Sequence, residues 1–458
     1  MNGLALILLL KKLSPREIGL VSIAAVFVTV LGAVSEVGFE AALIQAETIS
    51  KNQKNGVFWI GLFLSGLAFL SVFSAAPFIA HFYREPSLSP LLRVYLLVLF
   101  ANALKIIPYS QMVRRLEFGK ISVIESVSMV VSSVLMIFLA FKGMGAWSLV
   151  IAEITRVTGL FIGSQAGSFF VPGIKFSVKE VAPLFRFGFF ATMSRIFYNL
   201  YINADYLIVG KFFGTAAVGI YTVAYRLVFD TLKAGTGVIN KVAYPTFARL
   251  QKNLLRLKRA FFSIARMNLA GFGLFLVITA LYSDWVMLVL GYEKWLPAVP
   301  IIRLFCIIGL LRCVIPLIPQ LLNALGHSKL NFYYSALCAA VLPAAFFAGA
   351  QISIYGVVGA WLVFYPLVAL QLFFFALKHL SLSWREFAGE FISSSKILLM
   401  TIPAVFLCRI FFKHVGDGWK ILALAVSLLL SITVGMCCVF LFDKQIAKEF
   451  TRKIRKKG

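Results

Sequence analysis

Acidic residues and histidines are scarce in this sequence, and their scarcity excludes several classes of protein. Only 18 Asp and Glu residues accompany 44 Lys and Arg residues, which gives a formal net charge of +26. The four histidines, at positions 81, 327, 379 and 414, each stand near the end of an apolar segment. We therefore expect neither a metalloenzyme nor an enzyme that uses a histidine base.

Cysteine is also sparse, and its distribution excludes a disulfide framework. All six cysteines lie within apolar segments, with no Cys-x-x-Cys pair and no histidine at ligand spacing. Residues of this kind behave as small buried hydrophobic groups. The sequence also lacks a glycine-rich loop followed by lysine that would hold a nucleotide phosphate, so direct use of ATP is not expected.

Long apolar runs, by contrast, fill most of the chain. Hydrophobic residues make up 61% of the sequence, whereas globular proteins contain about 45–50%. Many of the runs are about 20 residues long, enough to cross a hydrocarbon layer about 30 Å thick. The sequence therefore predicts an all-α polytopic membrane protein.

Run length and polar interruptions predict thirteen full membrane spans after a short apolar run at residues 1–10. The short run cannot cross a membrane and lacks the features of a signal peptide, so we interpret it as the end of an incomplete first helix, from a misassigned start or a truncation. The predicted full spans are 17–44, 56–82, 89–112, 121–141, 145–167, 187–210, 214–245, 260–282, 297–325, 330–350, 355–378, 392–412 and 419–442.

Positive residues concentrate in alternate connections, which predicts the orientation of the chain. The richer set includes the connection at 249–259 and the tail at 444–458. Because cytoplasmic loops carry the excess of Lys and Arg, the C-terminus should lie in the cytoplasm. The basic tail is expected to rest on anionic lipid headgroups.

Three short segments recur in the same order at an offset of about 200 residues. The segment 18–24 recurs as 218–224, Gly145-Ala146-Trp147 as 359–361, and Ile107-Pro108 as 315–316. Repeats of this kind predict two parallel halves with a substrate site between them. The expected divisions are an N-terminal lobe over 1–167, a linker over 168–186, a C-terminal lobe over 187–380, two additional helices over 381–443 and a basic cytoplasmic tail over 444–458.

Charged residues within the apolar spans point to an anionic, membrane-associated substrate. A single Arg or Lys costs about 2.5–3.5 kcal/mol at the centre of a span. Arg226, Asp230 and Lys233 are spaced i, i+4 and i+7, which places them on one helical face. Two interpretations stay open: a basic wall of a substrate cavity, or a charged set that packs the lobes together.

A second polar stripe contains Arg195, Asn199 and Asn203 at i, i+4 and i+8. These side chains are candidates for substrate binding, although polar groups in membrane helices often serve only to join helices. Asp205 lies nearby on another face, and we expect it to form an ion pair within the bundle.

Two further cations precede prolines at nearly equivalent points of the two halves: Lys105 before Pro108 and Arg312 before Pro316. Because proline permits a helix to bend, these cations are candidates for the two sides of a cavity. Arg303 lies about 180° around the helix from Arg312 and is expected to reach toward the membrane interface instead.

The remaining charged candidates are Glu125, Glu153 and Arg156. Glu153 and Arg156 are three residues apart and are able to neutralise each other. For Glu125 two roles stay open, either carrying a coupling proton or pairing with Lys105 or another cation.

The residues resemble those of a known family at several points. The segments are 13–21, 38–45, 203–211, 219–227, 244–251, 295–300 and 323–326. Together they resemble Wzx-type polysaccharide exporters of the multidrug/oligosaccharidyl-lipid/polysaccharide exporter superfamily, in the branch of colanic and teichuronic acid exporters. The resemblance covers about residues 10–380.

This resemblance implies fourteen helices, with two six-helix lobes around a central cavity. It also implies a flippase that moves undecaprenyl-pyrophosphate-linked oligosaccharide across the bacterial inner membrane, with membrane lipids and polysaccharide polymerase machinery as partners and no nucleic acid. No cofactor is expected, and a proton or sodium gradient is the candidate energy source. The alternatives are a multidrug or cation exporter of the same superfamily and a membrane-embedded enzyme; the scarcity of acidic residues and of large loops disfavours both.

Overall fold

A computed structural model describes residues 9–36, 38–46, 48–175, 178–380, 383–413 and 419–442. The described part of the chain contains no β-strand, so the predicted all-α class is confirmed. In the N-terminal part the helices are α2 (Pro15–Glu36), α3 (Phe39–Gln45), α4 (Lys51–Phe82), α5 (Leu88–Tyr95), α6 (Leu97–Arg114), α7 (Phe118–Phe141), α8 (Ala146–Gly167) and α9 (Val178–Tyr225).

The remaining helices follow a short π-helical turn, η1 (Arg226–Asp230). They are α10 (Thr231–Leu250), α11 (Leu254–Val289), the 3-10 turn η2 (Glu293–Trp295), α12 (Ala298–Arg312), α13 (Leu317–Ala324), α14 (Ser328–Ala350), α15 (Ile354–Leu380), α16 (Trp384–Lys413) and α17 (Lys420–Phe442). The basic tail predicted at 444–458 lies outside the described residues.

Each of the thirteen predicted spans corresponds to helical structure, although only eleven segments of the described chain meet the length and hydropathy expected of a membrane span. One of these, Thr192–Gly237, combines two predicted spans that meet at Gly214, where the backbone leaves the helical region (φ 82°). The predicted span at 392–412 lies in α16, whose apolar stretch Thr401–Phe411 is shorter. One of the two missing spans is therefore joined to its neighbour, and the other has too short an apolar stretch to meet the criterion.

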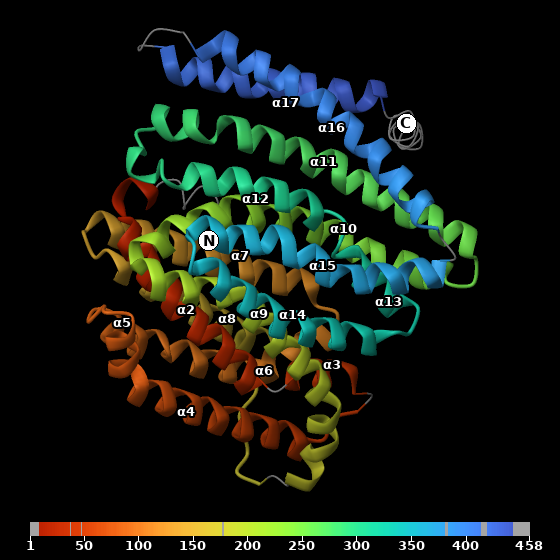
Figure 1. Ribbon diagram of the computed structural model, residues 1–458. Helices are drawn as coiled ribbons and strands as arrows, with labels where there is room; N and C mark the ends of the chain where they lie inside the picture. Colours follow the sequence, from red (N-terminus) through yellow and green to blue (C-terminus); the bar gives the residue numbers. More distant parts are fainter. Residues whose placement is uncertain are drawn as a thin grey trace. The chain divides into compact units, whose positions relative to one another are not determined.

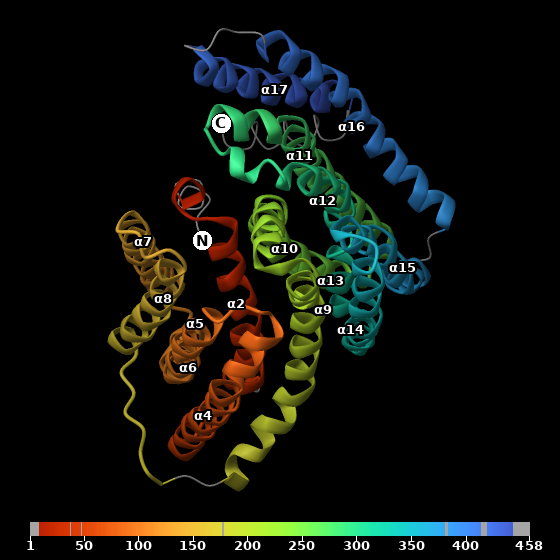
Figure 2. The same ribbon diagram turned by 60° about the vertical axis from the view of Figure 1, so that its left-hand side comes forward.

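The chain forms two compact units. The first contains residues 1–222 with 338–343, and the second contains residues 223–337 with 344–458. In the first unit α2 packs against α4, α5, α6 and α8, and buried apolar side chains of α3, α4 and α6 form a common core. After α8 the chain runs extended before α9 begins (Figure 2). Asn55 and Trp59 of α4 hold this extended segment by donating to backbone carbonyls of Lys175 and Gly173.

In the second unit α16 and α17 lie along α11 (Figure 1). Tyr282 and Trp285 of α11 pack with Val405 of α16 and Leu424 of α17 in a buried cluster. The Tyr282 hydroxyl also lies 2.8 Å from the hydroxyl of Ser431 on α17. The two additional helices predicted after the second half are thus joined to α11 by both apolar and polar contacts.

Helix α7 exposes a row of large apolar side chains that water would not tolerate. These are Val123, Val127, Val130, Val131, Val134 and Phe138, each more than half exposed. Contiguous apolar patches larger than a few hundred Å² are rare on soluble monomers. The face of α7 that carries these side chains is therefore suited to lipid chains.

The two copies of the first repeat contact each other through their glycines. A Cβ atom on Gly19 would overlap the carbonyl oxygen of Thr215, and a Cβ on Gly219 would overlap the carbonyl oxygen of Pro15. Ser22 and Thr222, also 200 residues apart, join their hydroxyls at 2.9 Å. Small residues permit such backbone approach in membrane helices, so this reciprocal contact explains why glycine stands at both positions.

We predict that Gly19→Ala destabilises the protein by about 1–3 kcal/mol, because the added methyl group would force the two backbones apart. The matched control is Gly119→Ala in the first turn of α7, where a Cβ meets nothing within 4 Å. Alanine is better than glycine in a helix, so the control should be neutral or stabilising. Thermal unfolding of the purified proteins in detergent is the measurement, and equal midpoints for the two variants would contradict the packing argument.

Candidate substrate-binding residues

A cluster of charged side chains lies in the first unit where α2 ends and α3 begins. Glu36 is the last residue of α2, and its carboxylate forms an ion pair with Arg195 of α9 at 2.6 Å. The Glu36 side chain is 11% exposed and that of Arg195 57% exposed. Glu36 thus anchors the pair within the bundle, and the guanidinium group of Arg195 occupies its open side.

Glu40 connects this ion pair to α6. It lies in the first turn of α3, just after Gly38, whose positive φ of 62° allows the chain to turn between the helices. Glu40 interacts electrostatically with Glu36, Arg195 and Lys105. The side chains of α2, α3, α6 and α9 are therefore coupled by charge at this point.

Lys105, Tyr109 and Glu125 extend the cluster to α7. The Tyr109 hydroxyl donates to Glu125 Oε1 at 3.0 Å, and Lys105 Nζ lies 5.9 Å from the centroid of the Tyr109 ring. We call Glu36, Glu40, Lys105, Tyr109, Glu125 and Arg195 the N-terminal charged cluster. Its three carboxylates and two cations come from five helices.

The other predicted residues of α9 lie close to Arg195 in sequence but make different contacts. The side-chain amide of Asn203 donates to the Asn199 carbonyl at 2.8 Å, so these two residues interact along the helix. Asp205 is fully buried and accepts hydrogen bonds from the Tyr221 hydroxyl at 2.7 Å and from the Tyr206 backbone N–H. Asp205 therefore joins two stretches of α9 that flank the break at Gly214.

Arg312 of the second unit lies among four aromatic rings. Its guanidinium carbon is 4.1 Å from the ring centroid of Phe229, 4.3 Å from Trp361, 5.3 Å from Tyr365 and 5.7 Å from Tyr225. Arg312 Nη1 also donates to the Tyr225 hydroxyl at 3.1 Å. We call these four rings the aromatic cage. Cation–π contacts contribute from about 0.5 to about 2 kcal/mol each, most where water is excluded.

The π-helical turn η1 lies beside two rings of this cage. It contains Arg226 and Asp230 and places the buried Phe229 between them. Arg226 is half-buried, whereas Asp230 and Lys233 are exposed. A π turn adds a residue to the helical repeat, so the i, i+4, i+7 spacing of Arg226, Asp230 and Lys233 does not correspond to a regular α-helical face here.

Three other ion pairs offset charge in or between the helices. Arg156 of α8 forms a two-pronged pair with Glu153, at 2.8 and 2.5 Å. Asp284 of α11 contacts Arg409 of α16 at 2.6 Å and Arg303 of α12 at 3.4 Å. The sequence pattern did not identify Asp284 or Arg409, because their partners lie far away along the chain.

Glu36 and Glu40 were likewise missed as site candidates. They are spaced i, i+4 around Gly38, and Glu40 belongs to the segment 38–45 that carries part of the family resemblance, so that spacing was the available signal. No group of three or more His, Cys, Asp or Glu residues within the described ranges is arranged to hold a metal ion.

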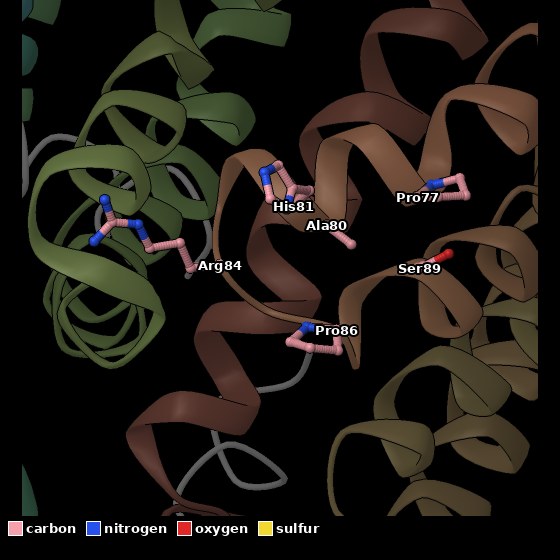
Figure 3. Close-up of a pocket in the computed structure, with 6 residues that line it drawn as sticks. All are labelled: Pro77, Ala80, His81, Arg84, Pro86 and Ser89. Carbon is pink, nitrogen blue, oxygen red and sulfur yellow. The ribbon is translucent and has the colours of Figure 1, made fainter.

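A cavity of about 500 Å³ lies at the turn between α4 and α5 (Figure 3). It is lined by Pro77, Ala80, His81, Arg84, Pro86 and Ser89. The side chain of Arg84 points away from the other five residues, so the cavity does not gather its two basic side chains. The charged candidates above lie elsewhere.

The same turn is held by a carboxylate, Glu85, which accepts from Arg16 Nη2 and from the Thr215 hydroxyl, both at 2.6 Å. Lys211 Nζ donates to the Phe82 carbonyl beside it at 3.1 Å. We call Arg16, Glu85, Lys211 and Thr215 the Glu85 clamp. It joins the start of α2, the α4–α5 turn and the middle of α9, next to the contact between Gly19 and Gly219.

Comparison with known proteins identifies the family. Residues 8–300 match the family described as "Polysaccharide biosynthesis protein". The chain belongs to this family. It is therefore a multi-pass membrane protein of the polysaccharide-exporter group, and the resemblance to Wzx-type exporters deduced from its segments is confirmed.

Several named relatives agree with this assignment. The chain is 28% identical over 322 residues to the teichuronic acid biosynthesis protein TuaB of Bacillus subtilis, a match that covers 69% of this chain and 66% of TuaB, just under two thirds of its length. It is 26% identical over 357 residues to the lipopolysaccharide biosynthesis protein WzxC of Escherichia coli, covering 76% of this chain and 71% of WzxC. The succinoglycan biosynthesis transport protein ExoT of Rhizobium meliloti is 25% identical over 432 residues, covering 90% and 84%.

Solved structures show the same fold. The lipid II flippase MurJ in an inward closed conformation matches with a TM-score of 0.72 at 14% identity, covering 97% of this chain and 98% of MurJ. An inward-facing multidrug resistance transporter of the MATE family matches with a TM-score of 0.65 at 15% identity, covering 82% and 93%. At these identities the comparison establishes the fold alone.

The Glu85 clamp predicts a specific dependence of stability on pH. The hydrogen bond from Arg16 holds the pKa of Glu85 below its usual value, and the bond from Thr215 lowers the pKa further, against the opposing effect of burial. A carboxylate whose pKa is lowered on folding stabilises the protein above its unfolded pKa of about 4.3. That stabilisation is lost as the pH falls through the lower, folded pKa.

We therefore expect the unfolding midpoint of the wild type to fall between pH 5 and strongly acidic pH, with a smaller fall in Glu85→Gln. Thermal unfolding across this range in detergent is the measurement, with Glu293→Gln, an exposed carboxylate of η2, as control. Parallel pH profiles for wild type and Glu85→Gln would show that the clamp does not contribute.

Proposed function

We propose that this protein is a flippase that carries undecaprenyl-pyrophosphate-linked oligosaccharide from the cytoplasmic to the periplasmic leaflet of the bacterial inner membrane. The names of its relatives concern polysaccharide, lipopolysaccharide and succinoglycan biosynthesis, and one of them is a transport protein. The fold is shared over nearly the whole length with a flippase of a lipid-linked substrate. The protein moves its substrate and makes or breaks no bond in it.

The observation that supports this proposal most directly is the aromatic cage of Arg312, which lies within an apolar helical segment. The chain also belongs to a family described as polysaccharide biosynthesis proteins. A pyrophosphate carries about two negative charges and loses hydration when it enters the membrane. The planar guanidinium group is suited to phosphate oxygens because it presents paired N–H donors. The rings fix its plane while adding no competing negative charge.

The orientation of the chain follows from its positive residues. We propose that the C-terminus and the 249–259 connection face the cytoplasm, as the distribution of Lys and Arg indicates. The Glu85 clamp and the contact between Gly19 and Gly219 then lie on the periplasmic side.

Partners and energy source follow from the same proposal. The substrate lipid and the surrounding membrane lipids are in contact with the protein, and polysaccharide polymerase machinery receives the product in the periplasmic leaflet. A proton or sodium gradient is the proposed energy source, with Glu125, Asp205 and Asp230 as acidic candidates for coupling.

One observation favours a second function, export of cationic compounds. The N-terminal charged cluster contains three carboxylates, and the fold is shared with a multidrug transporter. Negative side chains are suited to cationic drugs. The two functions are separated by testing whether cells that express the protein resist cationic dyes or instead clear lipid-linked oligosaccharide.

We predict that Arg312→Gln lowers export at least roughly tenfold, because the guanidinium charge is lost from its cage. Arg312→Lys should retain part of the activity, since lysine supplies the charge but not the planar donor pairs. The measurement is accumulation of lipid-linked oligosaccharide in cells whose only copy of the gene encodes the variant.

Arg226→Gln and Lys233→Gln belong in the same series, because both residues are candidate cations near η1. The control is Arg385→Gln, an exposed residue in the first turn of α16. Each variant is first shown to reach the membrane at the wild-type level. Normal export by Arg312→Gln, Arg226→Gln and Lys233→Gln together would refute recognition of the pyrophosphate by these cations.

A further inference from the structure

The arginine of the N-terminal charged cluster has a different kind of neighbour from Arg312. Arg312 packs on aromatic rings, whereas Arg195 is held by a carboxylate, Glu36, at 2.6 Å. Glu36 Oε2 accepts from one donor atom of the guanidinium group, Nη1, which a phosphate oxygen could also use. An anion that takes this donor therefore competes with Glu36 for the same cation.

The unequal burial of the two side chains allows an anion to compete for Arg195. Glu36 is buried at the end of α2, while the Arg195 side chain is more than half exposed. A long arginine side chain can turn its head group away from a fixed partner without moving the helix that carries it. The exposed member of the pair is thus the cation, and the buried member is the acid.

A second carboxylate lies close to the same arginine. Glu40 of α3 interacts electrostatically with Arg195 and also with Lys105 of α6. Arg195 therefore interacts with both carboxylates, and Lys105 interacts with Glu40. The other charged groups nearby have partners of their own: Glu125 accepts from Tyr109, Arg156 pairs with Glu153, and Arg114 donates to the backbone carbonyls of Leu43 and Ala46.

The carboxylates stabilise the cations while no substrate is bound. A cation in a low-dielectric environment is destabilised by several kcal/mol when nothing offsets its charge. The internal acids supply that offset before the substrate arrives. They also weaken the net binding of an anion, since each new contact to phosphate replaces an existing contact to a carboxylate.

We propose that Arg195 and Lys105 form an anion site for the pyrophosphate head group, and that Glu36 and Glu40 are its built-in counter-ions, displaced when the substrate binds and restored when it leaves. This inference rests on the proposed function and adds to it the residues that limit affinity. The acids are positioning residues: they touch the cations and not the substrate. Their role is to keep binding weak enough for release.

The test is binding of inorganic pyrophosphate to the full-length protein in lipid nanodiscs, measured by isothermal titration calorimetry. Removing the competing charge in Glu36→Gln should tighten binding by roughly three- to tenfold, which corresponds to about 0.7–1.4 kcal/mol. Glu40→Gln should tighten it less, because Glu40 acts on the cations through electrostatic interaction. Arg195→Gln should weaken binding by at least roughly tenfold.

The matched control is Glu117→Gln, which removes a carboxylate from an exposed i, i+3 pair with Lys120 on α7 and should leave the affinity unchanged. A merely structural role for Glu36 predicts weaker binding in Glu36→Gln, so tighter binding separates the two explanations. Glu40→Gln provides the same test if Glu36→Gln does not fold.

Two results would overturn the inference in distinguishable ways. If Arg195→Gln loses binding but neither acid variant gains any, the anion site exists and the counter-ion role is wrong, while the proposed function stands. If pyrophosphate binds neither the wild type nor the acid variants, or binds Arg195→Gln as well as wild type, the anion site itself is refuted, and this part of the proposed recognition falls with it.

Discussion

The cost of placing a charge among apolar helices governs the arrangement of this protein. Four arginines within the helices have specific neighbours that offset their charge, and the neighbours are of two kinds. Arg156, Arg195 and Arg409 are held by carboxylates at 2.5–2.6 Å. Arg312 is held by the faces of aromatic rings. Aromatic faces stabilise a cation through its electrostatic attraction to the electron-rich ring.

We propose that this difference separates charges with a structural role from charges that bind substrate. Arg156 and Glu153 lie on one helix and form two hydrogen bonds with each other, so each offsets the charge of the other. Arg195 reaches Glu36 from another helix and remains more than half exposed. We regard the exposed, exchangeable pair and the caged guanidinium as the two points where an anion would meet the protein.

Much of the fold was predictable from the sequence because the thickness of a membrane dictates the length of an apolar helix. The thirteen predicted spans all correspond to helices. The repeat at 18–24 and 218–224 predicts two related halves, and this division stays a prediction. What the repeat did not reveal is that its two copies touch. That contact depends on glycines at 19 and 219 that admit a carbonyl oxygen of the opposite copy.

The site was only partly predictable, because its contacts join residues that are far apart in the sequence. The sequence identifies Arg195, Lys105 and Arg312 as charges within apolar runs, but their partners lie far away along the chain. Glu36 is 159 residues from Arg195, and Trp361 belongs to a different helix from Arg312. The π turn at 226–230 is equally hidden, because helical spacing assumes 3.6 residues per turn throughout. Local patterns thus locate the charges, whereas the tertiary packing determines what holds them.

We propose that cations within the helical bundle recognise a pyrophosphate head group. This is tested by comparing the binding of two short-chain polyprenyl lipids, one ending in pyrophosphate and one in a neutral hydroxyl, to the purified protein in nanodiscs. The pyrophosphate lipid should bind at least roughly tenfold more tightly, and added salt should reduce the difference. Equal affinity for the two lipids would contradict it.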